Sequence, residues 1–126
     1  MTPEELGRSP YVSLVTRRRN GTPVPTPVWA VADGGELFVW TRSDSGKVKR
    51  IRNSGRVRVA VCDVRGRVPE GAPYAEGEAR LLDAEGLRRV RKLLARKYGW
   101  RFRFVDGGGA LVRLGKRPHT AIAVTF

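Results

Sequence analysis

The sequence of 126 residues carries 25 Lys or Arg against 12 Asp or Glu, so its formal net charge is +13 at pH 7. This length fits one domain over residues 1–126, large enough to bury a core without disulfides or metals. A single cysteine excludes an intrachain disulfide, and the absence of a long apolar run or signal segment predicts a cytoplasmic protein with no membrane span.

The basic excess attracts polyanions such as nucleic acid, phosphorylated cofactors and anionic lipid. Only five of the 25 basic residues are lysines, and a GC-rich coding genome can produce such an arginine bias without selection for binding. The net charge alone therefore does not select a ligand.

The first half of the chain predicts strands joined by tight turns. After a short helical turn or loose arm at the start, residues 11 to 17 alternate as a strand, and Asn20-Gly21 predicts a turn into a second strand over about residues 22 to 32. Asp33-Gly34-Gly35 predicts the next turn, before a strand over residues 36 to 42 that is apolar on both faces. We expect the barrel interior to cover one face and a partner subunit to cover the other.

The second half mixes helices with strands. Its pattern predicts a short helix over residues 45 to 53, strands from about 57 to 65 and 74 to 82, a helix from its cap at Asp83 to Tyr98, and a last strand over 119 to 126. About six strands joined mostly by hairpins, with two helices and no βαβ alternation, predict a mainly β fold, a small antiparallel barrel.

The segment from Thr41 to Arg50 is a candidate anion site, because a strand end passes through small residues into a helix. A lysine in the first helical turn is unfavourable unless an anion is bound there, since the helix start is already partly positive. Thr41, Ser45, Gly46 and Lys47 could together hold a phosphate. The alternative is that Ser45 only caps the helix and that Lys47 points to solvent.

Residues 23 to 29 are a second candidate, because prolines at 23, 25 and 27 alternate with other residues. All three remove N–H donors from the same strand edge, so that edge cannot pair in an ordinary ladder. It could face a planar ring, with Thr26 and Trp29 nearby, or it could be protected against aggregation.

The remaining reactive residue types predict no catalytic and no metal-binding residue. His119 has no evident acid partner, Cys62 is expected as a buried thiol, and Glu76 and Glu78 are expected on a solvated surface. If the protein is an enzyme, a cofactor should carry the reaction.

In these segments the sequence resembles the split-barrel flavin and deazaflavin oxidoreductases related to pyridoxamine phosphate oxidase, particularly the short actinobacterial members that depend on coenzyme F-420. The matching stretches are residues 21–29, 37–41, 45–52 and 56–63, in this order. The resemblance covers most of the chain and implies a split barrel that forms a homodimer, with two cofactor sites at the subunit interface.

The resemblance also implies roles for individual residues. The phosphate would be held by Thr41, Ser45, Gly46 and Lys47. The ring system would lie along Pro25, Thr26, Pro27, Val28 and Trp29, and Asp63, or Trp100 of the other subunit, would complete the site.

The activity that the resemblance implies is hydride transfer from reduced F-420 to an unsaturated small molecule. Vitamin B6 oxidation is disfavoured, because the chain ends without the substrate-binding segment of the oxidases proper. The polyglutamate tail of F-420 suits a basic groove near Arg42, Lys49, Arg50, Arg52, Arg56 or Arg58, so F-420 is favoured over FMN. A cofactor or tetrapyrrole carrier without turnover is a further alternative, and nucleic-acid binding is unlikely because no known motif supports it.

Overall fold

The computed structural model describes residues 2–99 and 119–126, and in these ranges the chain forms three helices and seven strands. Every strand pair is antiparallel. The helices are α1 (Pro3–Gly7), α2 (Gly46–Asn53) and α3 (Ala84–Tyr98), and the strands are β1 (Tyr11–Arg17), β2 (Pro23–Val28), β3 (Ala30–Asp33), β4 (Glu36–Arg42), β5 (Arg56–Cys62), β6 (Ala75–Leu81) and β7 (His119–Thr125).

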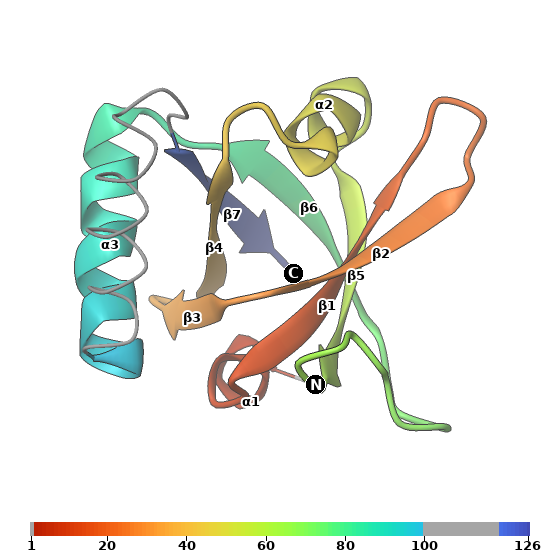
Figure 1. Cartoon of the computed structure of the whole chain (residues 1–126), viewed down its shortest axis with the longest axis horizontal. Helices are drawn as coiled ribbons and strands as arrows, with labels where there is room; N and C mark the ends of the chain where they lie inside the picture. Colours follow the sequence, from red (N-terminus) through yellow and green to blue (C-terminus); the bar gives the residue numbers. More distant parts are fainter. Residues whose placement is uncertain (1, 100–118) are drawn as a thin grey trace.

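The sheet closes on itself at one residue. Its strand order is β2-β1-β5-β6-β7-β4-β3, so β2 and β3 stand at opposite ends of the order. In the chain, however, only Trp29 separates them, and Figure 1 shows the two as one continuous orange ribbon. The two edges of the sheet therefore meet at Trp29, and the predicted mainly β, split antiparallel barrel is confirmed.

One detail differs from the sequence prediction, and one alternative left open there is decided. The strand expected over residues 22 to 32 is two strands, because β2 pairs with β1 whereas β3 pairs with β4. The chain start, for which a short helical turn and a loose arm were both open, is a short helix, which is capped because Thr2 accepts the N–H of Glu5 and the Glu5 carboxylate accepts the N–H of Thr2. The described residues therefore contain seven strands and three helices instead of about six and two.

The apolar residues form two layers, one inside the barrel and one under α3. Alternation along β4 divides its side chains between them, with Leu37 and Val39 inside and Phe38 outside against α3. Both faces of β4 are covered as expected, but α3 and not a partner subunit covers the outer face at Phe38. The inner layer consists of Leu6, Val12, Leu14, Val28, Ala30, Leu37, Val39, Ile51, Val57, Val59, Ala79, Ile122 and Val124.

The end of α3 holds the chain at the closure point through what we call the α3 clamp, Lys97 and Tyr98. The Tyr98 ring stacks on Trp29 at 4.5 Å between centroids, with 12° between the planes. The Tyr98 hydroxyl accepts the N–H of Ala30 at 3.1 Å and donates to the carbonyl of Pro10 at 2.8 Å. Lys97 Nζ donates to the carbonyls of Ser9 and Ala30. One helix end thus binds the residue at the seam, the first residue of β3 and the segment that precedes β1.

The first prediction concerns the hydroxyl of the clamp. Tyr98→Phe should keep the ring stack but leave the N–H of fully buried Ala30 without its partner. We expect the free energy of unfolding in urea to fall by about 1–3 kcal/mol. The matched control is Tyr74→Phe, since the exposed Tyr74 contacts Arg58 only through its ring. An equal loss in both variants would contradict the role of the clamp.

The second prediction is a pH dependence of stability. Burial lowers the pKa of Lys97 to about 8 and raises the pKa of Tyr98 to about 12. Between pH 8 and pH 10 the unfolded Lys97 binds more protons than the folded one, so this lysine should make stability rise with pH. Above pH 10 the unfolded tyrosine loses its proton first, so Tyr98 should make stability fall.

The measurement is the free energy of unfolding from pH 7 to pH 11, in the wild type and in Lys97→Met. The rise from pH 8 to pH 10 should be smaller in the variant, while the fall above pH 10 should persist. A rise of equal size in both proteins would show that other groups cause it.

Candidate functional site

The start of α2 brings together the residues predicted to hold a phosphate, Thr41, Ser45, Gly46 and Lys47, which we call the α2 cradle. Thr41, the next-to-last residue of β4, is buried, and its Oγ1 lies 3.4 Å from Oγ of Ser45. Ser45 occupies the N-cap position, but its side chain makes no capping hydrogen bond. The Ser45 side chain therefore does not cap the helix, and its hydroxyl shares a hydrogen bond with that of Thr41 instead.

Lys47 carries a half-buried charge in the first turn of α2, which contains no acidic residue. Its pKa is lowered, first by burial and then by the nearby cations of Arg50 and Arg42. Arg42 is paired with Asp44 at 3.0 Å, whereas no described carboxylate forms an ion pair with Lys47. Both burial and the positive helix start disfavour the ammonium here, so an anion bound to the cradle would relieve both.

Arg50 extends the positive region away from the cradle. Its guanidinium lies where a side chain on Gly46 would be, 2.6 Å from an ideal Cβ, so the glycine makes room for it. Its pKa is lowered by burial and by the charge of Arg18. Lys47, Arg50 and Arg18 thus form a line of interacting cations, which we call the basic track. Beyond Arg18 the surface is an open hollow of about 550 Å³ that Arg17, Arg19 and Arg56 also line.

The second predicted segment, Pro25 to Trp29, comprises the end of β2, an edge strand among the described residues, and Trp29 after it. Prolines 23, 25 and 27 face Arg17, Val15 and Ser13 across the β1–β2 register. Since prolines donate no hydrogen bond, Val24, Thr26 and Val28 must carry the ladder, and the proline carbonyls point away from β1. The prediction that the prolines mark an unpaired edge is confirmed. This edge offers acceptors to a ligand but no N–H at its proline positions.

Thr16 links the edge strand to α2. Its Oγ1 accepts a hydrogen bond from Nε of Arg50 at 2.6 Å and donates to the carbonyl of Val24 at 3.4 Å. Thr16 is fully buried at a barrel-facing position of β1, between strands that are otherwise lined by apolar residues. A polar residue at an inward position was the available sequence signal for this link, and the sequence prediction missed it. It also missed Arg18 and Tyr98, which act on residues distant in sequence.

The other predicted residues have separate surroundings. Val28 is buried in the barrel and Trp29 is half-buried against Tyr98. The Asp63 carboxylate accepts the N–H groups of Arg65 and Arg67, both at 2.9 Å, and so shapes the loop after β5. Gly66 of that loop, at φ +85°, brings the loop against Pro27, 3.2 Å from its Cδ to an ideal Cβ. The loop therefore borders the free edge, while Trp100 lies outside the described residues.

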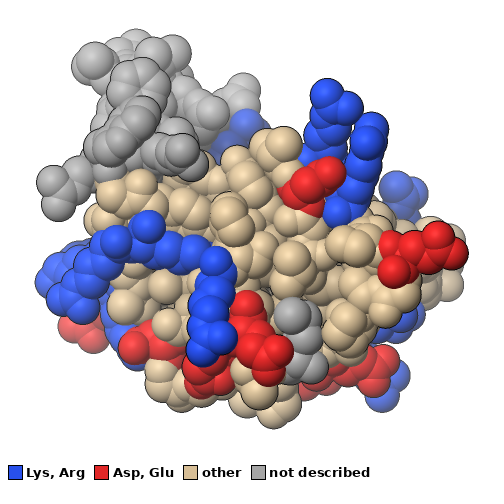
Figure 2. Space-filling model, turned by 90° about the horizontal axis from the view of Figure 1, so that it is seen from below, with Lys and Arg blue, Asp and Glu red and all other residues tan. Residues whose placement is uncertain are grey.

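The described residues also limit the chemistry. They contain no group of three His, Cys, Asp or Glu side chains that could hold a metal ion. None of the described helices is long and apolar enough to cross a membrane. In the view of Figure 2, uncharged residues cover the middle of the face, with basic and acidic side chains around them. The charged residues are thus not spread evenly over this face.

Comparisons with known proteins agree with this architecture. The family model described as pyridoxamine 5'-phosphate oxidase, PNPOx_N, matches residues 3–125. No curated protein sequence matches the chain.

Solved structures with the same fold are distant in sequence and varied in description. A conserved hypothetical protein of Mycobacterium tuberculosis matches with a TM-score of 0.70 and 21% identity, over 98% of this chain and 76% of that protein. HutZ, the heme storage protein of Vibrio cholerae, matches with a TM-score of 0.70 and 13% identity, over 96% of this chain and 84% of that protein. An FAD-binding protein of Mesorhizobium loti matches with a TM-score of 0.62 and 14% identity, over 96% of this chain and 82% of that protein. The match of the family model over nearly the whole chain identifies this protein as a member of the pyridoxamine 5'-phosphate oxidase family.

Proposed function

We propose that this protein binds the deazaflavin coenzyme F-420 and uses it to transfer a hydride to an unsaturated small-molecule acceptor. The observation that carries the proposal is the half-buried Lys47 at the uncapped start of α2. A cation that forms no ion pair with a described carboxylate, held where the helix is already positive, is suited to binding an anion. Family membership supports a flavin-type cofactor as the source of that anion.

The α2 cradle fits a phosphate in both charge and donors. The hydroxyls of Thr41 and Ser45, the amides at the start of α2 and the Lys47 ammonium can all donate to phosphate oxygens. Gly46 leaves room for the Arg50 guanidinium, which would lie 2.6 Å from a Cβ at this position and so stays close to the cradle. These residues bind and orient a cofactor but supply no acid or base of their own.

The free edge of β2 fits the polar rim of the ring system. Because Pro25 and Pro27 present carbonyls without N–H groups, a ligand lying there must donate its own hydrogen bonds, as the imide N–H of a flavin or deazaflavin can. Trp29 adds an aromatic surface that Tyr98 holds in place. When bound, the deazaflavin supplies the hydride, and the protein contributes position and electrostatics.

The basic track favours F-420 over FMN. Both cofactors carry a phosphate, but only F-420 continues into a chain of glutamate carboxylates, which Arg50 and Arg18 can accompany away from Lys47. An FMN-binding oxidoreductase is the first alternative. A cofactor carrier without turnover is the second, which the heme storage protein of the same fold supports.

We further propose that the functional unit is a homodimer in the cytoplasm. The cradle and the β2 edge both lie open on one subunit, and Asp63 or the partner subunit's Trp100 would close the ring site from the side. Size-exclusion chromatography with light scattering tests the dimer directly, since a monomer at micromolar concentration would overturn it.

The third prediction tests the cradle. Lys47→Ala should weaken F-420 binding, followed by fluorescence titration, about ten- to a hundredfold, because a charge-assisted phosphate contact contributes roughly 1.5–3 kcal/mol. The matched control is Lys92→Ala, which removes the same charge from an exposed position on α3. Circular dichroism should show both variants folded. Unchanged F-420 affinity in Lys47→Ala would contradict the proposal that the α2 cradle binds the phosphate.

The fourth prediction separates the two cofactors. Arg18→Ala should weaken F-420 binding about two- to fivefold at low salt, as expected for an exposed charge pair, and leave FMN binding unchanged. Raising the salt concentration should reduce the difference between variant and wild type. An equal loss for both cofactors would contradict a role of the track in holding the tail, and tight FMN binding without F-420 binding would move the protein to the flavin branch.

A further inference from the structure

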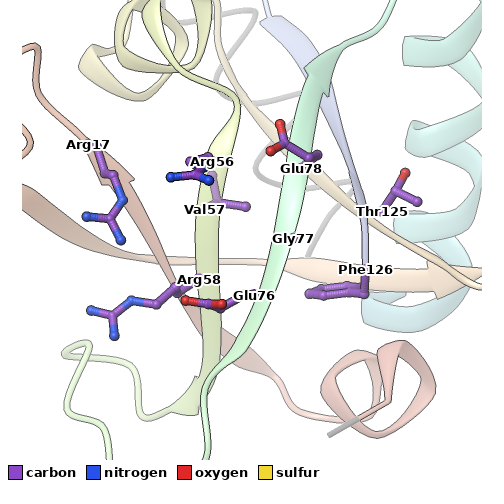
Figure 3. A pocket seen from close by; sticks show the side chains of 9 residues that line it. All are labelled: Arg17, Arg56, Val57, Arg58, Glu76, Gly77, Glu78, Thr125 and Phe126. Carbon is purple, nitrogen blue, oxygen red and sulfur yellow. The ribbon is translucent and has the colours of Figure 1, made fainter.

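A second hollow, of about 510 Å³, lies over β5 and β6, and no residue of the α2 cradle or of the Pro25–Trp29 edge lines it. In Figure 3, Arg17, Arg56 and Arg58 stand on one side of it, Phe126 stands on the other, and Glu76 and Glu78 lie between them. Its volume falls in the range of small-molecule sites, roughly 300–1,000 Å³. Arg17 and Arg56 also line the hollow beyond Arg18, whereas the glutamates and Phe126 belong to this hollow alone.

The arginine side concentrates positive charge on one face of the sheet. Arg58 faces Val15 in the β1–β5 register, so Arg17 and Arg56, each two residues further along, come opposite each other. No described carboxylate forms an ion pair with any of the three. Nε of Arg58 is buried without a hydrogen-bond partner, although its guanidinium lies 4.9 Å from the centre of the Tyr74 ring. Three neighbouring guanidinium groups can therefore donate hydrogen bonds to an anionic ligand.

The middle of the hollow carries hydrogen-bond acceptors. The register places Glu78 opposite Arg56 and Glu76 opposite Arg58, yet neither carboxylate closes an ion pair with its neighbour. Both glutamates are exposed. Their oxygens can accept hydrogen bonds from hydroxyl or amino groups of a ligand whose anionic end lies on the arginines.

The far side offers an aromatic face. At Gly77 an ideal Cβ would lie 3.1 Å from Cδ1 of Phe126 and 2.7 Å from the carbonyl oxygen of Thr125, so a larger residue would force the end of β7 away. The glycine thus lets the Phe126 ring lie beside β6 (Figure 3). Phe126 remains 40% exposed, which leaves ring surface for stacking.

We propose that this hollow binds a nucleoside monophosphate. Three arginines match the phosphate, which carries close to two negative charges at neutral pH, better than they match a single carboxylate. The glutamates accept the hydroxyl and amino hydrogens of the sugar and base, and the base stacks on Phe126. Across the hollow the arginines, the glutamates and the Phe126 ring follow one another in the same order as the phosphate, the sugar and the base of the ligand.

The test is isothermal titration of the full chain with AMP, adenosine and inorganic phosphate at physiological salt. AMP should bind with one-to-one stoichiometry, and adenosine and phosphate should each bind at least about tenfold more weakly, because each lacks one end of the ligand. If no saturable AMP binding is detected up to about 10 mM, the proposal is overturned.

Variants identify the place of binding. Arg58→Ala should weaken both AMP and phosphate binding about tenfold or more, whereas Phe126→Ala should weaken AMP binding and leave phosphate binding unchanged. Arg88→Ala, which removes an exposed arginine of α3, should change neither. Phe126 is exposed, so its variant remains informative if Arg58→Ala fails to fold.

A final comparison separates this hollow from the cofactor site. Lys47→Ala should leave AMP affinity unchanged, and FMN, which has no glutamate tail, should not displace AMP. If Lys47→Ala abolishes AMP binding, or if an equal loss follows Arg88→Ala, the nucleotide binds at the cradle or through general charge, and the assignment of the hollow is overturned.

Discussion

The seam at Trp29 is the constraint on which the rest of the structure depends. One continuous stretch of chain supplies both edges of the sheet, so the residue between β2 and β3 must be held in place from outside the sheet. The α3 clamp does this through a ring stack on Trp29 and hydrogen bonds to both polar groups of Ala30. Because the seam is fixed, β2 can leave its outer edge unpaired without the barrel opening, and that edge becomes available to a ligand.

The start of α2 reverses the usual charge preference of a helix. Stable helices place acidic residues in the first turn, whereas this one has Lys47 there, followed by Arg50. In the absence of a ligand, burial and the positive start of the helix both disfavour the Lys47 ammonium, and the charges of Arg50 and Arg42 repel it as well. Binding sites commonly contain groups that are unfavourable until the ligand arrives, and this physical argument supports the cradle independently of any resemblance.

Alternation and turn residues predicted most of the elements. Val12 and Leu14 against Ser13, and Asn20-Gly21 after them, are local signals, and the strand and turn they predicted are present. The break at Trp29 was missed because both halves have strand-like sequence, and only their pairing partners differ. The outer cover of Phe38 was assigned to a partner subunit because apolar periodicity does not reveal which element covers a face.

For the candidate site, the sequence predicted the cradle residues but not their connection to β2. The contact between Thr16 and Arg50 joins residues 34 positions apart, and that between Ala30 and Tyr98 spans 68. Such contacts depend on the closed barrel, which local patterns do not describe. Asp63 illustrates the converse, since its carboxylate is engaged by the backbone of its own loop in a way that short-range turn chemistry explains.

The position of β7 in the sheet has a consequence for how the chain reaches this structure. β7 lies between β6 and β4, so without it the sheet falls into a four-stranded part and a β4–β3 hairpin, which are connected by the chain at Trp29 and through α2 but share no strand pairing. During synthesis, the barrel can therefore close only after residues 119–125 have emerged. Pairings this distant in sequence fold slowly, and until they form, the apolar inner faces of β4 and β6 stay exposed to chaperones and to other unfinished chains.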